Sequence, residues 1–271
     1  MSQHAELRRL LVIGGSDSSG GAGIQADIKT GAALGVDVAT AIAAITAQNS
    51  LGVHAIDPVT PAMLRAQIAS VCSDIPPHAV KLGMLCDAAR VSVVADAIRS
   101  YELRNVVCDP ALVSTSGAPL LDARGSRLLL TLLPFFTLIT PNLMEAAALT
   151  GMCVRDSASL LEAGRTLLDR GANAVLLKGG HLDGDECVDV LLQKRCIDPI
   201  YLPSPRVETR NDHGTGCVLA SAIASGLARG LELVAAVKSG CAFVQAALQR
   251  SASLWTGAGR GSMNLLDEKL E

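Results

Sequence analysis

Short apolar runs of strand length alternate with longer segments of helical period along this chain of 271 residues. Most of these runs are continuous, which is typical of strands that are covered on both faces. Such an alternation produces crossover units and a mainly parallel sheet. The predicted strands are residues 10–13, 38–45, 80–82, 106–108, 137–139 and 175–177. The predicted helices are residues 23–34, 61–71, 88–99, 157–170, 216–228 and 233–250.

The pattern changes after residue 178. Residues 186–192 and 197–202, separated by a polar turn, predict an antiparallel hairpin at one edge of the sheet. The composition, 49% hydrophobic and 18% charged, supports a large core and argues against long disordered stretches. Since no internal repeat or linker interrupts the chain, we predict one α/β domain over residues 1–271.

Composition also narrows the choice of partners. The formal charge is -3, aromatic residues make up 2%, and no dense basic run is present, so we expect no nucleic-acid partner. The apolar run that follows the polar start stops at Gly14, too early for a secretory core or a membrane span. We therefore expect a cytoplasmic protein without membrane contact. The eight cysteines form no Cys-x-x-Cys pair and are interpreted as reduced thiols.

A first glycine-rich segment, residues 14–23, follows the first predicted strand and leads into a helix. It lets the backbone approach a ligand closely, although a flexible turn is the simpler interpretation. Its glycines have Walker A spacing, but Gly21 and Ala22 stand where Lys and Ser or Thr are required. Residues 21–26 fit the dinucleotide fingerprint, yet residues 46–49 offer no acid for a ribose hydroxyl. P-loop and Rossmann enzymes are therefore disfavoured.

A second glycine-rich segment, residues 211–217, reads Asn-Asp-His-Gly-Thr-Gly-Cys and opens a predicted helix of small residues. Glycines at the start of a helix expose unpaired N–H groups, so the segment is a ready anion site. The simpler interpretation is a glycine turn that ends on a buried Cys217. Because ligands collect beyond the carboxyl ends of parallel strands, we treat both glycine-rich segments as parts of one site.

Further motifs extend this pattern through most of the chain: Thr-Ala-Gln-Asn at 46–49, Lys-Leu-Gly-Met-Leu at 81–85, Thr-Pro-Asn-Leu-Met-Glu at 140–145 and Lys-Gly-Gly-His at 178–181. In this order the motifs resemble ribokinase-like enzymes, and within them the bacterial hydroxymethylpyrimidine and phosphomethylpyrimidine kinases of thiamine biosynthesis. The resemblance implies a ribokinase-like three-layer α/β/α fold, use of ATP with Mg²⁺, and a homodimer. It also implies two successive phosphoryl transfers, first to the pyrimidine alcohol and then to its monophosphate.

The resemblance implies roles for individual residues. Gln48 is a pyrimidine contact, since a side-chain amide offers both a donor and an acceptor to an aminopyrimidine. The other implied substrate contacts are Asp27, Ala22, Gly23, Met84 and Ala111. The implied ATP contacts are Lys178, Asn142, Thr209 and Gly216. Magnesium, which retains much of its water, is assigned to Glu145, Asn142 and Asp109. The implied catalytic turn consists of Gly214, Thr215, Gly216 and Cys217.

Cys217 stands where many sugar kinases of this fold carry an aspartate that acts as general base. We hypothesise that the helix N-terminus favours the Cys217 thiolate, which then accepts the proton of the substrate alcohol. A neutral thiol, in turn, does not repel the monophosphate in the second transfer. The alternative is that Cys217 is a small residue that merely fits the helix start.

Two segments depart from the usual wording of the resembled family. Ser18 stands where proline is common, and residues 110–117 differ from the customary version, which leaves substrate scope open. A pyridoxal or pyridoxine kinase of the same superfamily is the nearest alternative, and Gln48 with Met84 favours the pyrimidine over it. A catalytically idle ligand sensor is the other alternative. Retention of Lys178 and Glu145 argues against a sensor, which needs no transfer apparatus.

Overall fold

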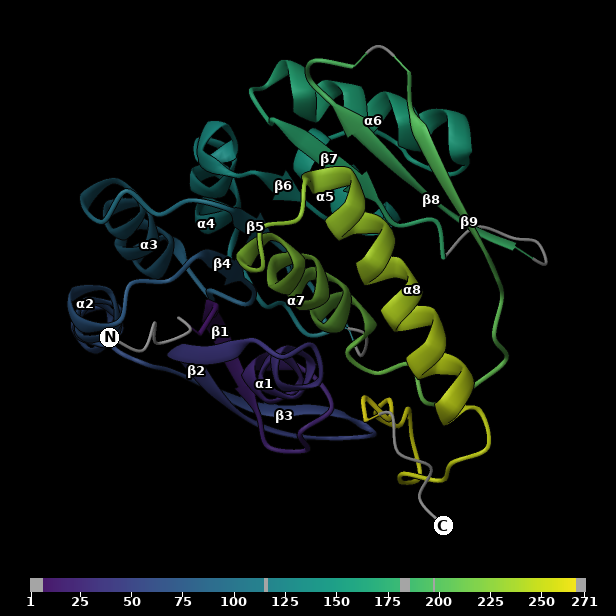
Figure 1. Cartoon of the computed structure of the whole chain (residues 1–271), viewed down its shortest axis with the longest axis horizontal. Helices are drawn as coiled ribbons and strands as arrows, with labels where there is room; N and C mark the ends of the chain where they lie inside the picture. Colours follow the sequence, from purple (N-terminus) through teal and green to yellow (C-terminus); the bar gives the residue numbers. More distant parts are fainter. Residues whose placement is uncertain (1–6, 115–116, 181–185, 197, 267–271) are drawn as a thin grey trace, which may run out of the picture.

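The structure of this protein is a computed structural model that describes residues 7–114, 117–180, 186–196 and 198–266. Within these residues one sheet of nine strands runs through the molecule in the order β3-β2-β1-β4-β5-β6-β7-β8-β9 (Figure 1). The strands are β1 (Arg9–Asp17), β2 (Asp37–Asn49), β3 (Gly52–Pro58), β4 (Ala79–Leu82), β5 (Val106–Cys108), β6 (Leu138–Ile139), β7 (Ala174–Leu177), β8 (Glu186–Gln193) and β9 (Ile200–Pro205). In this order, neighbouring strands from β2 to β7 pair in parallel. Strand β3 pairs antiparallel with β2 at one edge, and β8 and β9 form antiparallel pairs at the other edge.

Helices cover both faces of the sheet. They are α1 (Gly23–Ala33), α2 (Pro61–Asp74), α3 (Ala88–Ser100), α4 (Ala123–Leu130), α5 (Leu143–Thr150), α6 (Ser157–Asp169), α7 (Thr215–Ala228) and α8 (Leu233–Ser251), with a short 3₁₀ turn η1 (Leu133–Phe135). Figure 1 shows α1, α7 and α8 together on one face of the sheet. Helices α2 to α6 pack on the other face.

Strand β1 explains why the predicted strands carry no polar alternation. Leu11 and Ile13 pack into the core beneath α2 to α6, whereas Leu10 and Val12 pack beneath α1, α7 and α8. All four side chains are fully buried. Since successive side chains of a strand point to opposite faces, a strand between two helical layers must be apolar at every position. The predicted three-layer α/β/α fold is confirmed.

The sequence prediction was incomplete at several elements. Strand β2 continues past residue 45 to Asn49 and turns back into β3, so antiparallel pairs lie at both edges rather than at one. Strand β3 was missed because most of its side chains are exposed or half-exposed and show no apolar run. Helices α4 and α5 have only eight residues each, too few for a clear helical period. The second strand of the predicted hairpin begins at Ile200, and residue 197 lies outside the described residues.

A buried ion pair joins the middle of the sheet to the helical layer above it. Lys81 in β4 is 1% exposed, and its Nζ lies 2.8 and 2.9 Å from the two carboxylate oxygens of Asp27 in α1. Ser221 in α7 donates to the same carboxylate over 2.6 Å. Burial acts to lower the pKa of Lys81, but the Asp27 carboxylate outweighs it and raises that pKa. Burial raises the pKa of Asp27, and the charge and hydrogen bonds of Lys81 and Ser221 oppose this effect. Because Lys81 lies within 2.9 Å of both carboxylate oxygens, we take the pair as ionised, and it connects α1 and α7 to β4.

Replacing Lys81 tests how strongly this pair supports the fold. Lys81→Met leaves the Asp27 carboxylate buried without a counter-charge, which is expected to lower the free energy of unfolding by about 3–5 kcal/mol. The double variant Lys81→Met with Asp27→Asn removes both charges and is expected to be more stable than Lys81→Met alone. Urea unfolding followed by circular dichroism measures both variants. Equal losses of stability would show that the charge pairing is unimportant.

Candidate active site

The two glycine-rich segments are in direct contact. Gly214, at the N-terminus of α7, has a φ of 86°, and a Cβ at this position would lie 2.0 Å from the carbonyl oxygen of Gly21. Gly23, where α1 begins, has a φ of 57°, and its Cβ would lie 2.4 Å from the Gly15 carbonyl oxygen. Both backbones therefore approach more closely than any residue with a side chain allows. The predicted meeting of the two segments at one end of the sheet is confirmed.

Asp17, the last residue of β1, folds the first glycine-rich segment around its carboxylate. The side chain is 3% exposed and accepts hydrogen bonds from the backbone N–H groups of Ser19, Gly21 and Ala22 over 2.8, 3.2 and 2.8 Å. Burial acts to raise the pKa of Asp17, but hydrogen bonds from His213, Ser19 and the backbone outweigh it and hold that pKa well below its usual range. Asp17 is therefore ionised at neutral pH.

Gln48 lies at the end of β2, directly beside the residue that precedes Gly214. Its side-chain amide is 3.0 Å from His213 Nε2 and 3.2 Å from Thr46 Oγ1. Its backbone N–H and C=O each lie 2.8 Å from the Ser18 hydroxyl. Ser18, one of the departures noted in the sequence, thus fixes the Gln48 backbone. The predicted pyrimidine contact and the predicted phosphate turn therefore lie next to each other.

A cluster of charged side chains faces the same helix start. Lys178 Nζ lies 3.1 Å from Asp109 Oδ1 and 3.6 Å from Glu145 Oε2, and all three side chains are at least 85% buried. A Cβ on Gly216 would lie 3.2 Å from Lys178 Nζ and 3.4 Å from Asp109 Oδ2. We call Lys178, Asp109 and Glu145 the Lys178 cluster. The start of α7 thus has Gln48 on one side, in contact with His213, and the Lys178 cluster on the other, facing Gly216.

Asn142 and Glu145 form a capping box at the start of α5. Asn142 Oδ1 accepts from the Glu145 N–H, and Glu145 Oε2 accepts from the Asn142 N–H, each over 2.9 Å. Such a box satisfies two N–H groups that the helix itself leaves unpaired. Burial raises the pKa of Glu145; Lys178 opposes this effect and Asp109 adds to it. The two predicted metal ligands therefore also have a structural role.

The donors in this cluster suit a hydrated magnesium ion. Asp109 and Glu145 provide buried carboxylate oxygens, which are ligands that Mg²⁺ prefers. Among the residues described, no group of three or more His, Cys, Asp or Glu side chains can hold a metal ion. A metal that takes its remaining ligands from water and from a substrate phosphate fits such an incomplete donor set. We therefore retain Asp109 and Glu145 as the proposed magnesium side chains, with Asn142 next to them.

The surroundings of Cys217 argue against the hypothesis that its thiolate is favoured. The side chain is half-buried beside the Gly23 backbone and near Lys81. Burial raises the pKa of Cys217 to about 11; the positive charge of Lys81 lowers it, while Asp27 and Asp109 add to the rise. Loss of solvation and the nearby carboxylates therefore outweigh Lys81 and the hydrogen bond from the Gly23 backbone, which favours the neutral thiol at physiological pH.

Asp27 also differs from its predicted place. Its side chain is fully buried and both carboxylate oxygens are bonded to Lys81, so the expected direct contact with substrate is corrected to a supporting position beneath the site. Met84 lies beside the first glycine-rich segment, where a Cβ on Gly15 would be 2.9 Å from its Sδ. Ala22 and Gly23 lie at the start of α1, next to Gly214 and Cys217.

The remaining predicted residues lie in chain segments next to β5, α7 and Lys178. Ala111 is two residues beyond Asp109 and has a φ of 41°, a left-handed conformation that is strained for a residue with a side chain. The hydroxyl of Thr209 accepts from the Asn211 N–H over 3.0 Å in the segment that leads into α7. Thr215 is the first residue of α7. His181, part of the motif at 178–181, lies outside the described residues.

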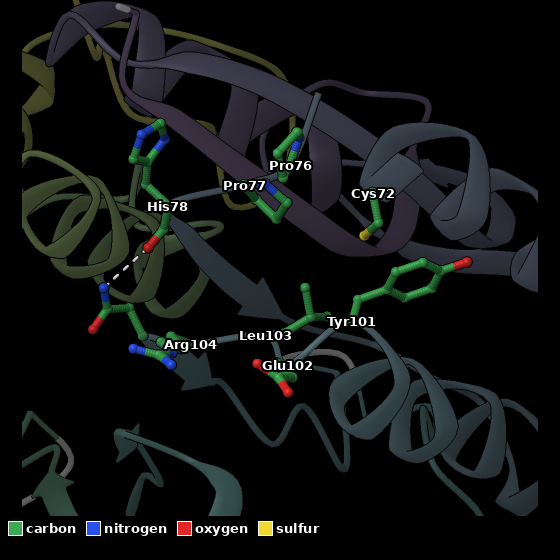
Figure 2. A pocket seen from close by; sticks show the side chains of 9 residues that line it. Cys72, Pro76, Pro77, His78, Tyr101, Glu102, Leu103 and Arg104 are labelled. Atoms are coloured by element: carbon green, nitrogen blue, oxygen red, sulfur yellow. Dashed lines mark hydrogen bonds between the residues drawn. The ribbon is translucent and has the colours of Figure 1, made fainter. Parts of the chain in front are cut away.

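Sequence reasoning assigned no role to Asp17, His213, Lys81 or Ser221. Asp17 is one polar residue of the glycine-rich segment and Lys81 one residue of a short predicted strand, and only the fold shows what their charges face. His213 was visible within the second glycine-rich segment, so its position before Gly214 was an available signal. A separate cavity of about 260 Å³ lies at the amino ends of β4 and β5. The side chains that line it include His78 and Tyr101 (Figure 2). That cavity contains none of the predicted site residues.

No helix in the described ranges is long and apolar enough to cross a membrane. All eight cysteines are free, and of these Cys72 and Cys108 are buried.

A mainly parallel sheet with a glycine-rich helix start, a lysine and two carboxylates at one end is the arrangement of small-molecule kinases of the ribokinase-like class. The chain belongs to the phosphomethylpyrimidine kinase family, whose model matches residues 17–264. It is 46% identical to a hydroxymethylpyrimidine/phosphomethylpyrimidine kinase of Rhizobium meliloti over 94% of this chain and 95% of that protein. It is 43% identical to a thiamine biosynthesis bifunctional protein of Geobacter sulfurreducens, over 94% of this chain and 51% of that protein.

A solved structure gives the same fold. The pyridoxal kinase of Staphylococcus aureus in complex with AMP-PCP and pyridoxal superimposes with a TM-score of 0.87 at 29% identity, over 96% of this chain and 94% of that one. The structural likeness thus extends to a vitamin kinase with a different substrate, whereas the sequence family is that of the pyrimidine kinases.

The contact between Gly214 and Gly21 can be tested by adding one methyl group. Gly214→Ala is expected to push the two segments apart and to lower kcat/KM on the order of a hundredfold, because misplacing reacting groups by about 1 Å has effects of that size. Gly230→Ala is the matched control, since Gly230 has a φ of 89° and nothing within 4 Å of the added Cβ. The control is expected to lose only ~1–2 kcal/mol of stability. Similar kcat/KM values for the two variants would contradict the contact.

The protonation of Cys217 can be measured by alkylation. With a pKa raised to about 11, its rate of reaction with iodoacetamide is expected to keep rising roughly tenfold per pH unit from pH 7 to pH 10. Mass spectrometry of peptides after timed labelling gives the rate at Cys217 and, as an internal control, at exposed Cys153. A plateau at Cys217 below pH 8 would instead show that the thiolate is favoured.

Proposed function

We propose that this chain transfers the γ-phosphoryl group of ATP to 4-amino-5-hydroxymethyl-2-methylpyrimidine and then to its monophosphate, in the biosynthesis of thiamine diphosphate. One observation carries the proposal: a single turn, residues 213–216, touches Gln48 on one side and faces the Lys178 cluster on the other. Substrate recognition and phosphate binding are therefore adjacent, as an in-line transfer requires.

The phosphate half of the site works mainly by charge. The unpaired N–H groups at the start of α7 and the ammonium of Lys178 stabilise negative charge on the migrating phosphoryl group. Asp109 and Glu145 would hold Mg²⁺, which neutralises charge between the phosphates of ATP. Lys178 is held by these two carboxylates until the phosphates arrive. Asn142 and Thr209 stay proposed ATP contacts, and the AMP-PCP complex of the staphylococcal relative supports the use of ATP.

A neutral Cys217 changes the proposed chemistry of the first transfer. Phosphoryl transfer passes through a loose transition state, so it depends more on position than on a strong base. We propose that the Cys217 thiol occupies the start of α7 without repelling either acceptor, whether alcohol or phosphate. We propose the Asp109 carboxylate, which faces Gly216, as the acceptor for the alcohol proton.

The substrate half is proposed to read the heterocycle through Gln48, with Met84, Ala22, Gly23 and Ala111 around it. The half-buried amide of Gln48 offers a donor and an acceptor to the aminopyrimidine edge. Membership in the phosphomethylpyrimidine kinase family supports the pyrimidine over pyridoxal as the main substrate.

The cytoplasmic location and the homodimer stay predictions. The exposed side chains of Ile45 and Leu51, beside edge strand β3, support a dimer interface at this edge.

A substrate panel tests this function directly. Release of ADP in a coupled assay is expected with hydroxymethylpyrimidine and with its monophosphate, at a kcat/KM at least about tenfold above that for pyridoxal. Ribose is expected to give no turnover. Lys178→Met is expected to lower kcat/KM on the order of a hundredfold or more for both pyrimidines, because it removes charge stabilisation of the transition state. Absence of turnover with every substrate would favour a ligand sensor instead.

A further inference from the structure

His213 connects the buried Asp17 carboxylate to the Gln48 amide. Its Nε2 lies 3.0 Å from Asp17 Oδ2 and 3.0 Å from the side-chain nitrogen of Gln48. The imidazole is 15% exposed and is packed against the first glycine-rich segment, where a Cβ on Gly21 would lie 2.7 Å from His213 Cδ2. One ring nitrogen therefore faces two polar neighbours in a position from which the ring has little room to turn.

The carboxylate decides which ring nitrogen carries the hydrogen. An ionised carboxylate only accepts hydrogen bonds, so His213 Nε2 must carry a hydrogen to bond Asp17. Asp17 is ionised because His213, Ser19 and the loop backbone hold its pKa well below the usual range against the effect of burial. A nitrogen that carries this hydrogen cannot accept one from the Gln48 NH₂ group. The amide must therefore turn its carbonyl oxygen toward His213, by a half-turn that leaves its shape unchanged.

The hydroxyl of Thr46 favours the same orientation of the Gln48 amide, independently of His213. The Thr46 hydroxyl lies 3.0 Å from the Ser16 carbonyl oxygen, to which it can only donate its single hydrogen. The structure places Gln48 Oε1 3.2 Å from the same hydroxyl, so two oxygens compete for its one hydrogen. If the oxygen and nitrogen of the amide exchange places, the hydroxyl accepts from Gln48 instead. The amide group that faces Thr46 is then NH₂. Both neighbours of Gln48 thus select one of its two orientations.

We propose that Asp17, acting through His213, fixes the orientation of the Gln48 amide, so that the site accepts a 4-aminopyrimidine and rejects its 4-oxo counterpart. His213 is then a positioning residue that determines specificity. The inference rests on the proposed function, in which Gln48 contacts the heterocycle.

The two heterocycles present opposite patterns at the edge that an amide reads. A 4-aminopyrimidine offers a ring-nitrogen acceptor beside an NH₂ donor, whereas the 4-oxo tautomer offers an N–H donor beside a carbonyl acceptor. An amide held in one orientation complements only one of these patterns. An amide that turns freely complements both, and the selectivity between them then disappears.

The test compares kcat/KM for 5-hydroxymethyl-2-methylpyrimidine bearing either a 4-amino or a 4-oxo group. The unsubstituted protein is expected to prefer the amino form by about a hundredfold or more, since the wrong pattern leaves buried polar groups unpaired. His213→Leu is expected to reduce this preference to below about tenfold, mainly through a lower KM for the oxo form. His213→Gln places an NH₂ donor near the former Nε2 and is expected to restore much of the preference.

A spectroscopic measurement checks the proton directly. Two-dimensional ¹H–¹⁵N spectra of imidazole nitrogens in the unsubstituted protein are expected to show a hydrogen on His213 Nε2. In Asp17→Asn the hydrogen is expected to become shared between both ring nitrogens. His78, whose Nδ1 accepts from the Arg9 N–H, is an internal reference for the same tautomer. This measurement stands even if His213→Leu does not fold.

The outcomes separate this inference from the proposed function. A His213 Nε2 without a hydrogen in the unsubstituted protein, or an amino preference that survives in His213→Leu, would overturn the inference and leave the function intact. Gln48→Ala is expected to lower kcat/KM for the amino form strongly. No change in Gln48→Ala would overturn the role of Gln48, and with it both proposals.

Discussion

The Asp17 carboxylate is the interaction on which the geometry of this site depends. It lies at the end of β1, folds the first glycine-rich segment around itself through backbone N–H groups, and accepts from His213 at the same end of the sheet. That last bond brings Gly214 onto Gly21 and thereby places the start of α7. Because the carboxylate is buried and ionised, each of these hydrogen bonds is charge-assisted and stronger than a neutral one.

A second buried charge, Lys81, determines the electrostatics beneath the site. Its pairing with Asp27 and the hydroxyl of Ser221 joins β4, α1 and α7 below the point where the phosphoryl group is proposed to move. Lys178 makes a comparable pair with Asp109 nearer the surface. The thiol of Cys217 lies near these charges and remains neutral, since burial outweighs the attraction of Lys81. The neutral thiol of Cys217 thus lies near both charged pairs, Lys81 with Asp27 and Lys178 with Asp109.

Ser18 and Ala111 show how departures from the resembled family are accommodated. The Ser18 hydroxyl bonds both backbone groups of Gln48, so it restrains the end of β2 by hydrogen bonds. Ala111 adopts a left-handed φ directly beyond the Asp109 strand end, where backbone strain accompanies a functional site. Ser18 thus lies beside the proposed substrate contact Gln48, whereas Ala111 lies two residues beyond Asp109, which pairs with Lys178. Differences in substrate scope within this class are therefore to be sought around Gln48.

The sequence by itself determined the fold class, the place of the main strands and helices, and the motifs whose residues meet at one end of the sheet. These follow from local period and from the rule that parallel strands end together. It did not determine β3, whose exposed side chains leave no pattern, nor the burial of Asp27, nor the protonation of Cys217. Only the tertiary structure decided these, because desolvation and pairing depend on which distant residues become neighbours. Asp17 and His213 lie 196 positions apart in the chain and 3.0 Å apart in the folded protein.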